Sequence, residues 1–173
     1  MLDMLLTRRS CRKFEGKAVE SEKKEKLLQA AQLAPTGKGT RPWEFVVIEN
    51  KETLKKLGDC RNPNQPFLPD TPLAIVVLGN TQKTDTWIED ASIASIVIQL
   101  EAEKLGLGSC WVQIRLRESN QGMSSEEYVR KLLGIPDHMA VLSVIAVGYP
   151  EGLKLKPHSL DEVDHAKIHT EAY

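Results

Sequence analysis

The sequence predicts an α+β layer structure built as one domain, in which helices alternate with strands. Four short runs are rich in β-branched or aromatic residues and have proline, glycine or asparagine near their ends, as buried strands do. Longer runs between them carry good helix formers and stop at glycine or proline. The 173 residues suffice for one buried core, and no internal repeat or low-complexity tract divides them.

The N-terminal part of the chain predicts two helices. Leucines at helical spacing indicate a short first helix that ends near Arg8 or Arg9, and a turn is expected over residues 10–16. Residues 21–33 are dominated by strong helix formers, and Pro35 stops the pattern. We therefore expect the second helix over 21–33.

Two buried strands, a helix and a loop are predicted next. Residues 43–49 and 73–79 are rich in β-branched and apolar side chains, which favours buried strands. Between them, residues 51–57 predict a helix that Asn50 caps with its side chain. The proline-rich stretch 61–72 predicts a loop.

A long helix is predicted over residues 85–105, where Gly106 ends it. Its middle, residues 91–98, has almost no polar side, so the helix needs cover all round. The small side chains in this stretch would permit close packing against a neighbouring element. We expect part of that cover to come from outside the chain.

The C-terminal third predicts two more strands, a helix and an arm. Residues 109–114 and 141–148 complete at least four strands, and between them Ser124 begins a capping box before a helix that ends at Gly134. Residues 151–173 are mostly polar, with apolar side chains too sparse for a second core. An arm is the expected form of this segment.

Charge and composition exclude several classes of protein. Lys and Arg number 23 against 24 Asp and Glu, a net charge of -1, so no general field attracts nucleic acid or an anionic membrane. No stretch approaches the roughly 18 apolar residues of a membrane span, and the N-terminus lacks the apolar run of an export signal. The three cysteines have no CxxC spacing, which disfavours a disulfide framework and a zinc site. We expect a cytoplasmic protein with no nucleic-acid or membrane partner.

The densest group of cations lies at residues 8–13, where the first helix gives way to the predicted turn. Three arginines and a lysine surround Ser10, so guanidinium groups, a hydroxyl and backbone amides occur together. These groups bind phosphate, and each charge-assisted hydrogen bond contributes about 1.5 to 3 kcal/mol. Taken alone, the cluster also fits a solvated surface.

Five segments together resemble the nitroreductase family of FMN enzymes, and the resemblance covers nearly the whole chain. In chain order they are residues 8–14 (RRSCRKF), 30–37 (AAQLAPTG) running to 41–45 (RPWEF), 64–67 (NQPF), 105–111 (LGLGSCW) and 147–150 (VGYP). The resemblance implies a nitroreductase-like α+β fold with a central, mostly antiparallel sheet flanked by helices in three layers. It also implies a homodimer with FMN at the subunit interface, in which residues 1–150 form the FMN-binding domain and 151–173 its C-terminal arm.

The resemblance also implies which residues of the cation group at residues 8–13, called the basic cluster below, contact FMN. Arg8 and Ser10 match the family's phosphate ligands, and Arg9 lies beside them on the ribityl side. Arg12 matches the cation near the flavin pyrimidine. Reduction leaves negative charge around N1 and C2=O, so a fixed cation there favours the reduced flavin.

The resemblance implies four further contacts to FMN. A turn of the partner subunit and a loop at the polar edge of the flavin ring supply two of them. The other two come from a strand whose backbone approaches the dimethylbenzene and N5 side of the ring, and from a pair of basic residues near the C-terminus that contact the phosphate. The residues concerned are Pro35, Thr36, Gly37 and Gly39 in the turn, Asn64 and Gln65 in the loop, Trp111, Val112 and Gln113 in the strand, and Lys156 and His158 in the pair. Glycines in the turn permit close backbone approach.

The chain departs from the family pattern in two of these positions. Many relatives have Asn where this chain has Gly39, which removes a side-chain contact to the flavin. They have Arg where this chain has His158, and a neutral histidine neutralises phosphate less well than an arginine. The chain is also short for the family and lacks the helical insertions that shape the acceptor pocket. The resemblance therefore does not specify the acceptor.

Cysteines and histidines outside this pattern have simpler explanations. Cys11 and Cys110 lie in matched segments, but the family uses no cysteine nucleophile and buried free cysteines behave as small hydrophobes. His165 and His169 are four residues apart, yet no third metal ligand is near them in the sequence, so a solvated arm is expected there.

Two tryptophans and two acids also have ordinary roles. Trp43 is expected in the core, and Trp87 begins the long helix, where it could pack at a subunit interface. Glu89 and Asp90 are most simply solvated or capping charges at the start of that helix.

The implied reaction is a ping-pong cycle in which NADH or NADPH reduces FMN and a small organic acceptor, such as a nitroaromatic or a quinone, reoxidises it. Hydride passes directly between nicotinamide and flavin, so no catalytic acid or base and no metal ligand is expected. Two alternatives stay open. One is a non-catalytic FMN-binding or carrier module, and the other is a family member with a different flavin reaction: dehalogenation, ring oxidation or flavin fragmentation.

Overall fold

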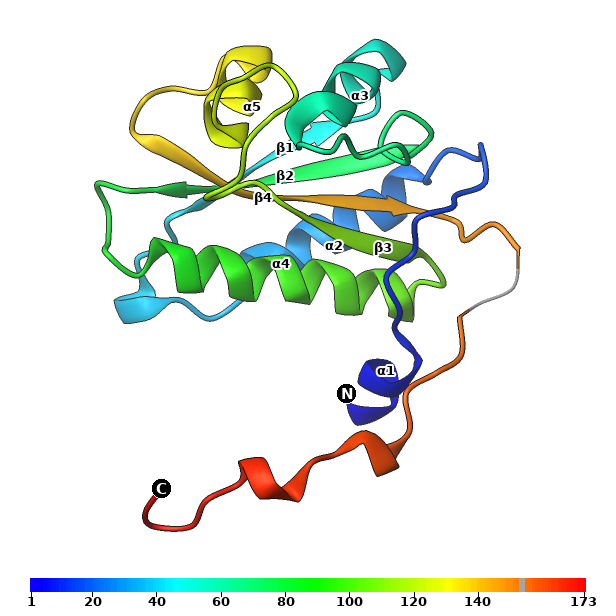
Figure 1. Cartoon of the computed structure of the whole chain (residues 1–173), viewed down its shortest axis with the longest axis vertical. Helices are drawn as coiled ribbons and strands as arrows, with labels where there is room; N and C mark the ends of the chain where they lie inside the picture. The colour runs from blue at the N-terminus through cyan, green and yellow to red at the C-terminus, as the bar shows by residue number, and fades with distance from the viewer. Residues whose placement is uncertain (153–154) are drawn as a thin grey trace.

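The β-branched runs of the sequence pair into a sheet, and the helix-forming runs cover it (Figure 1). The structure is a computed structural model that describes residues 1–152 and 155–173. The helices of the described residues are α1 (Leu2–Thr7), α2 (Ser21–Gln32), α3 (Lys51–Leu57), α4 (Trp87–Lys104) and α5 (Ser125–Leu133), with short 3₁₀ turns η1 (Gly37–Gly39), η2 (Gly58–Cys60), η3 (Leu160–Glu162) and η4 (His165–Lys167). The strands of the described residues are β1 (Trp43–Ile48), β2 (Leu73–Asn80), β3 (Gly108–Gln113) and β4 (Met139–Gly148).

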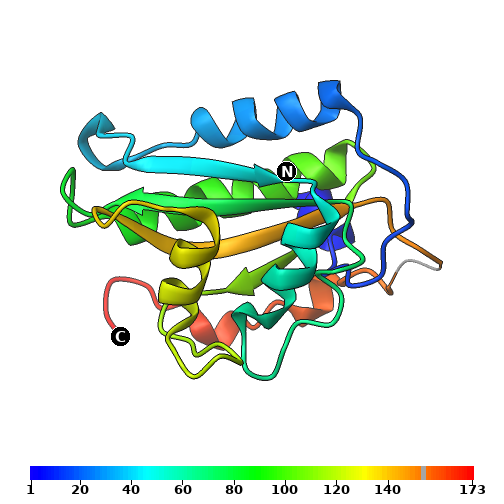
Figure 2. The ribbon, with the colours of Figure 1, turned by 90° about the horizontal axis from the view of Figure 1, so that it is seen from above.

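The sheet of the described residues has four strands in the order β1-β2-β4-β3, and all three neighbouring pairs are antiparallel. Figure 2 shows β1 and β3 at opposite edges of the sheet. Every residue of β4 is buried, because β4 lies between two strands and both faces of the sheet are covered. Helices α3 and α5 lie on one face, and α2 and α4 on the other (Figure 1). The predicted three-layer α+β fold is confirmed.

Two hydrophobic clusters fill the spaces between these layers. Side chains of the strands alternate between the faces, so Val76 and Val144 belong to the cluster under α3 and α5. Their neighbours Ile75 and Ile145 belong to the cluster under α2 and α4. Trp43 is 8% exposed and packs in a smaller cluster with Ala94, as expected of a core residue.

Local capping signals agree with the structure. The Asn50 side chain accepts a hydrogen bond from the Thr53 backbone N–H at 3.0 Å, and the Ser124 hydroxyl accepts one from the Glu127 N–H at 3.1 Å. Gly134 ends α5 in the left-handed conformation with φ of 66°. The start of α4 lies two residues later than predicted, because residues 85 and 86 belong to the preceding turn.

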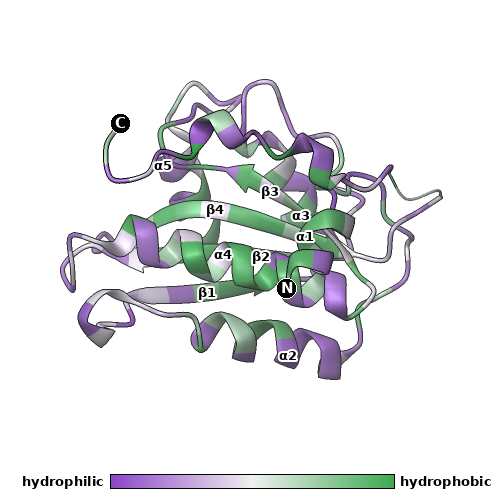
Figure 3. Cartoon of the chain, turned by 90° about the horizontal axis from the view of Figure 1, so that it is seen from below, coloured by the Kyte–Doolittle hydropathy of each residue, from purple (hydrophilic) through white to green (hydrophobic). Residues whose placement is uncertain are grey.

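One face of α4 is buried against the sheet, and the opposite face is not. Ala91, Ala94 and Ser95 are buried, and their small side chains let the helix approach the strands closely. Ile93 and Val97 lie on the outer face and are only partly buried. Figure 3 shows hydrophobic residues along this helix. A single chain therefore supplies only part of the cover that the sequence of α4 requires.

The predicted turn over residues 10–16 is wrong, because this segment is extended. Ser10 forms a parallel bridge with Ser109, and the Cys11 N–H donates to the Ser109 carbonyl at 2.9 Å. Phe14 forms an antiparallel bridge with Pro150, just after the end of β4. The edge strand β3 exposes a row of backbone groups that need partners, and pairing with them overrides the local turn preference.

The C-terminal segment leaves the sheet after β4 and runs past α1 (Figure 1). Its residues from 155 onward are exposed except His158, which is half-buried. Leu153 and Lys154 of the expected arm lie outside the described residues. No helix among the described residues has the length and apolar character needed to cross a membrane.

We predict that Gly148→Ala destabilises the fold. A Cβ at Gly148 would lie 2.6 Å from Cγ of Pro72 and 2.9 Å from Cδ1 of Phe14, so at least one of the two rings would have to shift. Overpacking of this kind lowers the free energy of unfolding by about 1 to 3 kcal/mol. Urea denaturation measures the change, with Gly16→Ala as the control, because a Cβ at Gly16 meets nothing within 4 Å. Equal stability of the two variants would contradict the packing described here.

Candidate functional site

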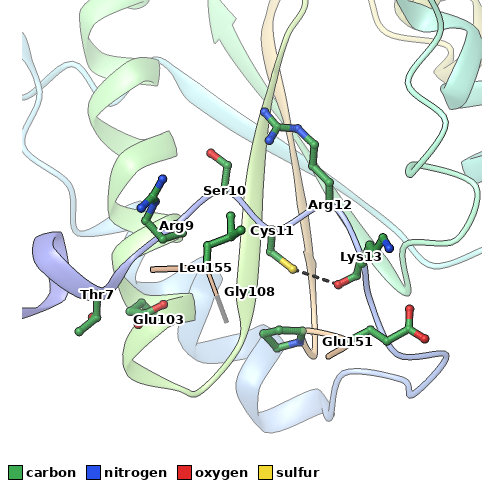
Figure 4. Close-up of a pocket in the computed structure, with 11 residues that line it drawn as sticks. Thr7, Arg9, Ser10, Cys11, Arg12, Lys13, Glu103, Gly108, Glu151 and Leu155 are labelled. Carbon is green, nitrogen blue, oxygen red and sulfur yellow. Dashed lines mark hydrogen bonds between the residues drawn. The ribbon is translucent and has the colours of Figure 1, made fainter. Parts of the chain in front are cut away.

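The extended segment places the basic cluster against the first half of β3. Arg9, Ser10 and Arg12 line a cavity of about 270 Å³ together with Gly108 and Pro150 (Figure 4). The missing side chain of Gly108 permits this approach, because a Cβ there would lie 2.8 Å from Sγ of Cys11. The cavity is thus walled by the N-terminal segment, the start of β3 and the end of β4.

Side chains of an extended segment alternate between its two sides. Arg8, Ser10 and Arg12 therefore share one side, and Figure 4 shows Ser10 and Arg12 pointing opposite to Cys11. On the other side, Sγ of Cys11 lies 3.1 Å from the Lys13 carbonyl oxygen. The three residues that the family resemblance assigns to the FMN phosphate and pyrimidine thus follow one another along a single side.

The arginines of the cluster differ in how they are engaged. The Arg9 guanidinium donates a hydrogen bond to the Lys156 carbonyl. Neither Arg8 nor Arg12 makes a side-chain hydrogen bond or ion pair with the residues that the structure describes. Both guanidinium groups are therefore available to bind an anion, and of the two Arg12 lines the cavity, whereas Arg8 is not among the residues of its wall.

The fields of these two arginines reach the buried thiol of Cys110. Burial is the main influence and raises the pKa of this thiol, while the charges of Arg12 and Arg8 act to lower it. Burial also raises the pKa of the Cys11 thiol, which lines the cavity. Both thiols are therefore disfavoured as thiolates and as nucleophiles.

The C-terminal segment meets the cluster at the predicted late basic pair. Lys156 supplies the carbonyl that binds Arg9, and the His158 N–H donates to the Leu6 carbonyl at 2.8 Å. Nδ1 of the His158 ring lies 2.7 Å from Oε2 of Glu162. Leu155 lines the cavity itself. The structure thus brings residues 155–158 to the phosphate-binding candidates.

The second half of β3 lies along the free edge of the sheet. The Gln113 carbonyl accepts from Nη1 of Arg61 at 2.9 Å on this edge, and the Ser109 carbonyl faces it too. Because alternate residues of a strand present their backbone groups to the same edge, the Trp111 N–H also faces outward. Val112 is 2% exposed, its side chain faces the core, and it pairs with Val144 of β4, so its backbone N–H and carbonyl point away from this edge.

The loop that carries Asn64 and Gln65 lies beside this edge. Arg61 ties the loop to the end of β3, and the Gln65 N–H donates to the Gly58 carbonyl at 2.8 Å. Asn64 is exposed and Gln65 half-buried. The candidate site therefore extends from the basic cluster at the start of β3 along the edge of this strand to the loop.

The turn with Pro35, Thr36, Gly37 and Gly39 lies at the other end of α4 (Figure 1). The 18 residues of α4 extend about 27 Å at 1.5 Å per residue. Within one chain this turn therefore does not meet the basic cluster, which lies near Glu103 at the C-terminal end of the helix.

Asp90 differs from the expected solvated or capping charge. It is 2% exposed, and its Oδ1 accepts a hydrogen bond from the Gly37 N–H at 2.8 Å. In the sequence, Asp90 directly precedes the apolar run 91–98, and this position is the signal that could have predicted its burial. Among the described residues no group of three His, Cys, Asp or Glu side chains could hold a metal ion.

Comparison with known proteins identifies relatives over the whole chain. The model of the nitroreductase family matches residues 5–62 and 59–149. An FMN-dependent nitroreductase from Clostridium difficile R20291 is 43% identical, with a TM-score of 0.96 and all of both chains covered.

Two curated relatives carry similar names. A protein from Archaeoglobus fulgidus, whose name gives NADH dehydrogenase/NAD(P)H nitroreductase as a provisional activity, is 36% identical over 99% of this chain and 98% of its own length. The FMN reductase (NADPH) of Bacillus subtilis is 24% identical over 99% of this chain and 74% of its own length.

Proposed function

The chain belongs to the nitroreductase family, and from this premise we propose that it binds FMN and passes electrons from NADH or NADPH to a small organic acceptor, such as a nitroaromatic or a quinone, in a ping-pong cycle. One observation carries the proposal. The two guanidinium groups of Arg8 and Arg12 and the Ser10 hydroxyl belong to alternate residues of an extended segment that pairs with the start of β3. The names of the relatives supply the donor and the cofactor.

The residues present fit the phosphate end of FMN. The cavity of about 270 Å³ is slightly smaller than the 300 to 1,000 Å³ that typical ligand sites occupy, so it suits part of the cofactor. Its walls provide charged and hydroxyl donors suited to a phosphate monoester. The flavin ring would extend from there along the edge of β3 toward Asn64 and Gln65.

A second copy of the chain would complete the site. The outer face of α4 is apolar and only partly buried, which favours a homodimer. In a two-fold pair with antiparallel α4 helices, the N-terminal end of one helix meets the C-terminal end of the other. That arrangement would place the turn of residues 35–39 from one copy beside the basic cluster of the other. The site would then lie between the two subunits, with the C-terminal arm alongside.

Each residue of the site has a limited task in this mechanism. FMN held there would supply the redox chemistry, taking up hydride from the nicotinamide and giving the electrons to the acceptor. Arg8 and Ser10 hold the phosphate, and Arg9 fixes the arm through Lys156. Arg12 places a positive charge at the pyrimidine, and the Trp111 N–H is offered to the ring from the edge of β3. No acid or base of the protein is required, because hydride transfer moves no separate proton at this stage.

We predict that the purified protein is yellow and releases FMN, about one per chain, from a homodimer with one site per subunit. A visible spectrum with analysis of the released flavin tests the cofactor, and light scattering should give twice the chain mass of 19.3 kDa. Steady oxidation of NADH or NADPH in the presence of a quinone or a nitroaromatic tests the reaction. Flavin binding without such oxidation would favour the carrier module or another flavin reaction, and absence of FMN binding would overturn the proposal.

Arg8→Ala is predicted to weaken FMN binding and to leave riboflavin binding nearly unchanged, because the guanidinium contacts the phosphate that riboflavin lacks. Loss of a charged hydrogen bond of about 1.5 to 3 kcal/mol raises the dissociation constant roughly 10- to 150-fold. Fluorescence titration with the two flavins measures both constants. Equal losses for the two ligands would remove Arg8 from the phosphate site.

Arg12→Gln is predicted to lower the two-electron potential of bound FMN. Reduction adds negative charge around N1 and C2=O, so a nearby cation binds the reduced form more tightly than the oxidised form. Removing a differential stabilisation of about 1.5 to 3 kcal/mol lowers the potential by roughly 30 to 60 mV. Redox titration against a reference dye measures it, with both proteins saturated with FMN.

Lys13→Gln is the matched control for this measurement. Lys13 lies one residue further along the extended segment, so its side chain points to the opposite side. The same change of charge at Lys13 should shift the potential less than the change at Arg12. An unchanged or raised potential in Arg12→Gln would mean that Arg12 does not face the pyrimidine.

A further inference from the structure

Asp90 is a buried carboxyl group that the proposed mechanism does not use. We propose that it is a positioning residue, which holds the turn of residues 36–41 in the form that a second copy of the chain needs for FMN binding. This inference rests on the proposed function. It adds a residue of α4 that touches neither the cofactor nor the substrate.

Asp90 connects the first turn of α4 to the loop before β1. Its Oδ1 accepts from the Gly37 N–H at 2.8 Å, and its Oδ2 accepts from the Thr86 hydroxyl at 3.3 Å. Asp90 lies in the first turn of α4, where the helix end is complementary to an acidic side chain. Burial at 2% exposure keeps water from competing for these bonds.

The turn itself has a backbone that requires external support. Lys38, Gly39 and Arg41 have φ angles of 53°, 67° and 46°, which lie in the left-handed region. Residues other than glycine rarely adopt this conformation, and it persists only where the surroundings hold it. Within the turn, the Arg41 N–H donates to the Thr36 hydroxyl oxygen at 3.3 Å. Among the described residues, the hydrogen bond from Gly37 to Asp90 joins this turn to α4.

Close approach makes that bond possible. A Cβ at Gly37 would lie 2.7 Å from Oγ1 of Thr86, so a larger residue would push the turn away from the helix. On its other side, the turn leads into Trp43, whose small cluster packs against Ile93 and Val97 of α4. The tip of the turn, Lys38 and Gly39, is exposed beside this apolar face.

In the proposed dimer a change at Asp90 should act on the FMN site of the other subunit. Each site would combine the basic cluster of one chain with the turn of its partner. A heterodimer of an Arg8→Ala chain with an Asp90→Ala chain would then contain one site without either change and one site with both. If Asp90 acted within its own chain, each of the two sites would carry one change.

The experiment uses both variants as homodimers and as the heterodimer, purified through two different affinity tags. We expect the Asp90→Ala homodimer to bind FMN about tenfold or more weakly, since a charge-assisted bond to the turn is lost. The heterodimer should bind about one FMN per dimer with the affinity of the unaltered protein. Such recovery also shows that the Asp90→Ala chain is folded, because its Arg8 serves the intact site.

Three further variants complete the design. Glu89→Ala removes the neighbouring exposed acid from the same first helical turn and should leave FMN affinity unchanged. Asp90→Asn keeps an acceptor for Gly37 and should recover most of the affinity. If Asp90→Ala does not fold, Gly37→Ala disturbs the same contact from the other side. A heterodimer of a Gly37→Ala chain with an Arg8→Ala chain should then also contain one FMN site of normal affinity.

Each outcome separates this inference from the proposed function. Normal affinity of Asp90→Ala, or a heterodimer without a site of normal affinity, would overturn the role of Asp90 while FMN binding by the unaltered protein still stands. Failure of the unaltered protein to bind FMN would overturn the proposed function and this inference with it.

Discussion

The apolar character of α4 on both of its faces is the constraint on which the remainder of the structure depends. Its inner face of small residues closes on the sheet, where Ala91, Ala94 and Ser95 are buried. Its outer face is only partly covered by the described parts of the same chain, and burying apolar surface of this kind is favourable by about 25 cal/mol per Å². The helix therefore organises the fold on one side and favours association on the other.

The two ends of α4 carry the two parts of the candidate site. The basic cluster lies near Glu103 at the C-terminal end, and the turn bound to Asp90 lies at the N-terminal end. A rigid helix keeps them about 27 Å apart within one chain. Two-fold pairing along the outer face would bring the N-terminal end of each α4 helix to the C-terminal end of α4 in the partner subunit. Association and cofactor binding would then depend on the same face.

Much of the fold follows from local signals, and these were predictable. The Asn50 cap, the glycine that ends α5 and the boundaries of α2 depend on residues within one or two turns of the chain. Two features depend on distant residues. The extended form of residues 10–14 depends on the free edge of β3, and burial of Asp90 depends on a turn 53 residues earlier in the chain. Neither partner can be identified from spacing along the sequence.

The extended form of the N-terminal segment changes how its cations act. A turn would scatter the side chains of residues 8–12, whereas an extended segment places alternate residues on one side at about 7 Å intervals. Arg8, Ser10 and Arg12 therefore follow one another for about 13 Å along the β3 edge. The Arg9 guanidinium is engaged separately, because it donates to the Lys156 carbonyl and so ties the arm to this segment. In a chain with a net charge of -1, this local order concentrates positive charge where the proposed cofactor needs it at both its phosphate and its ring.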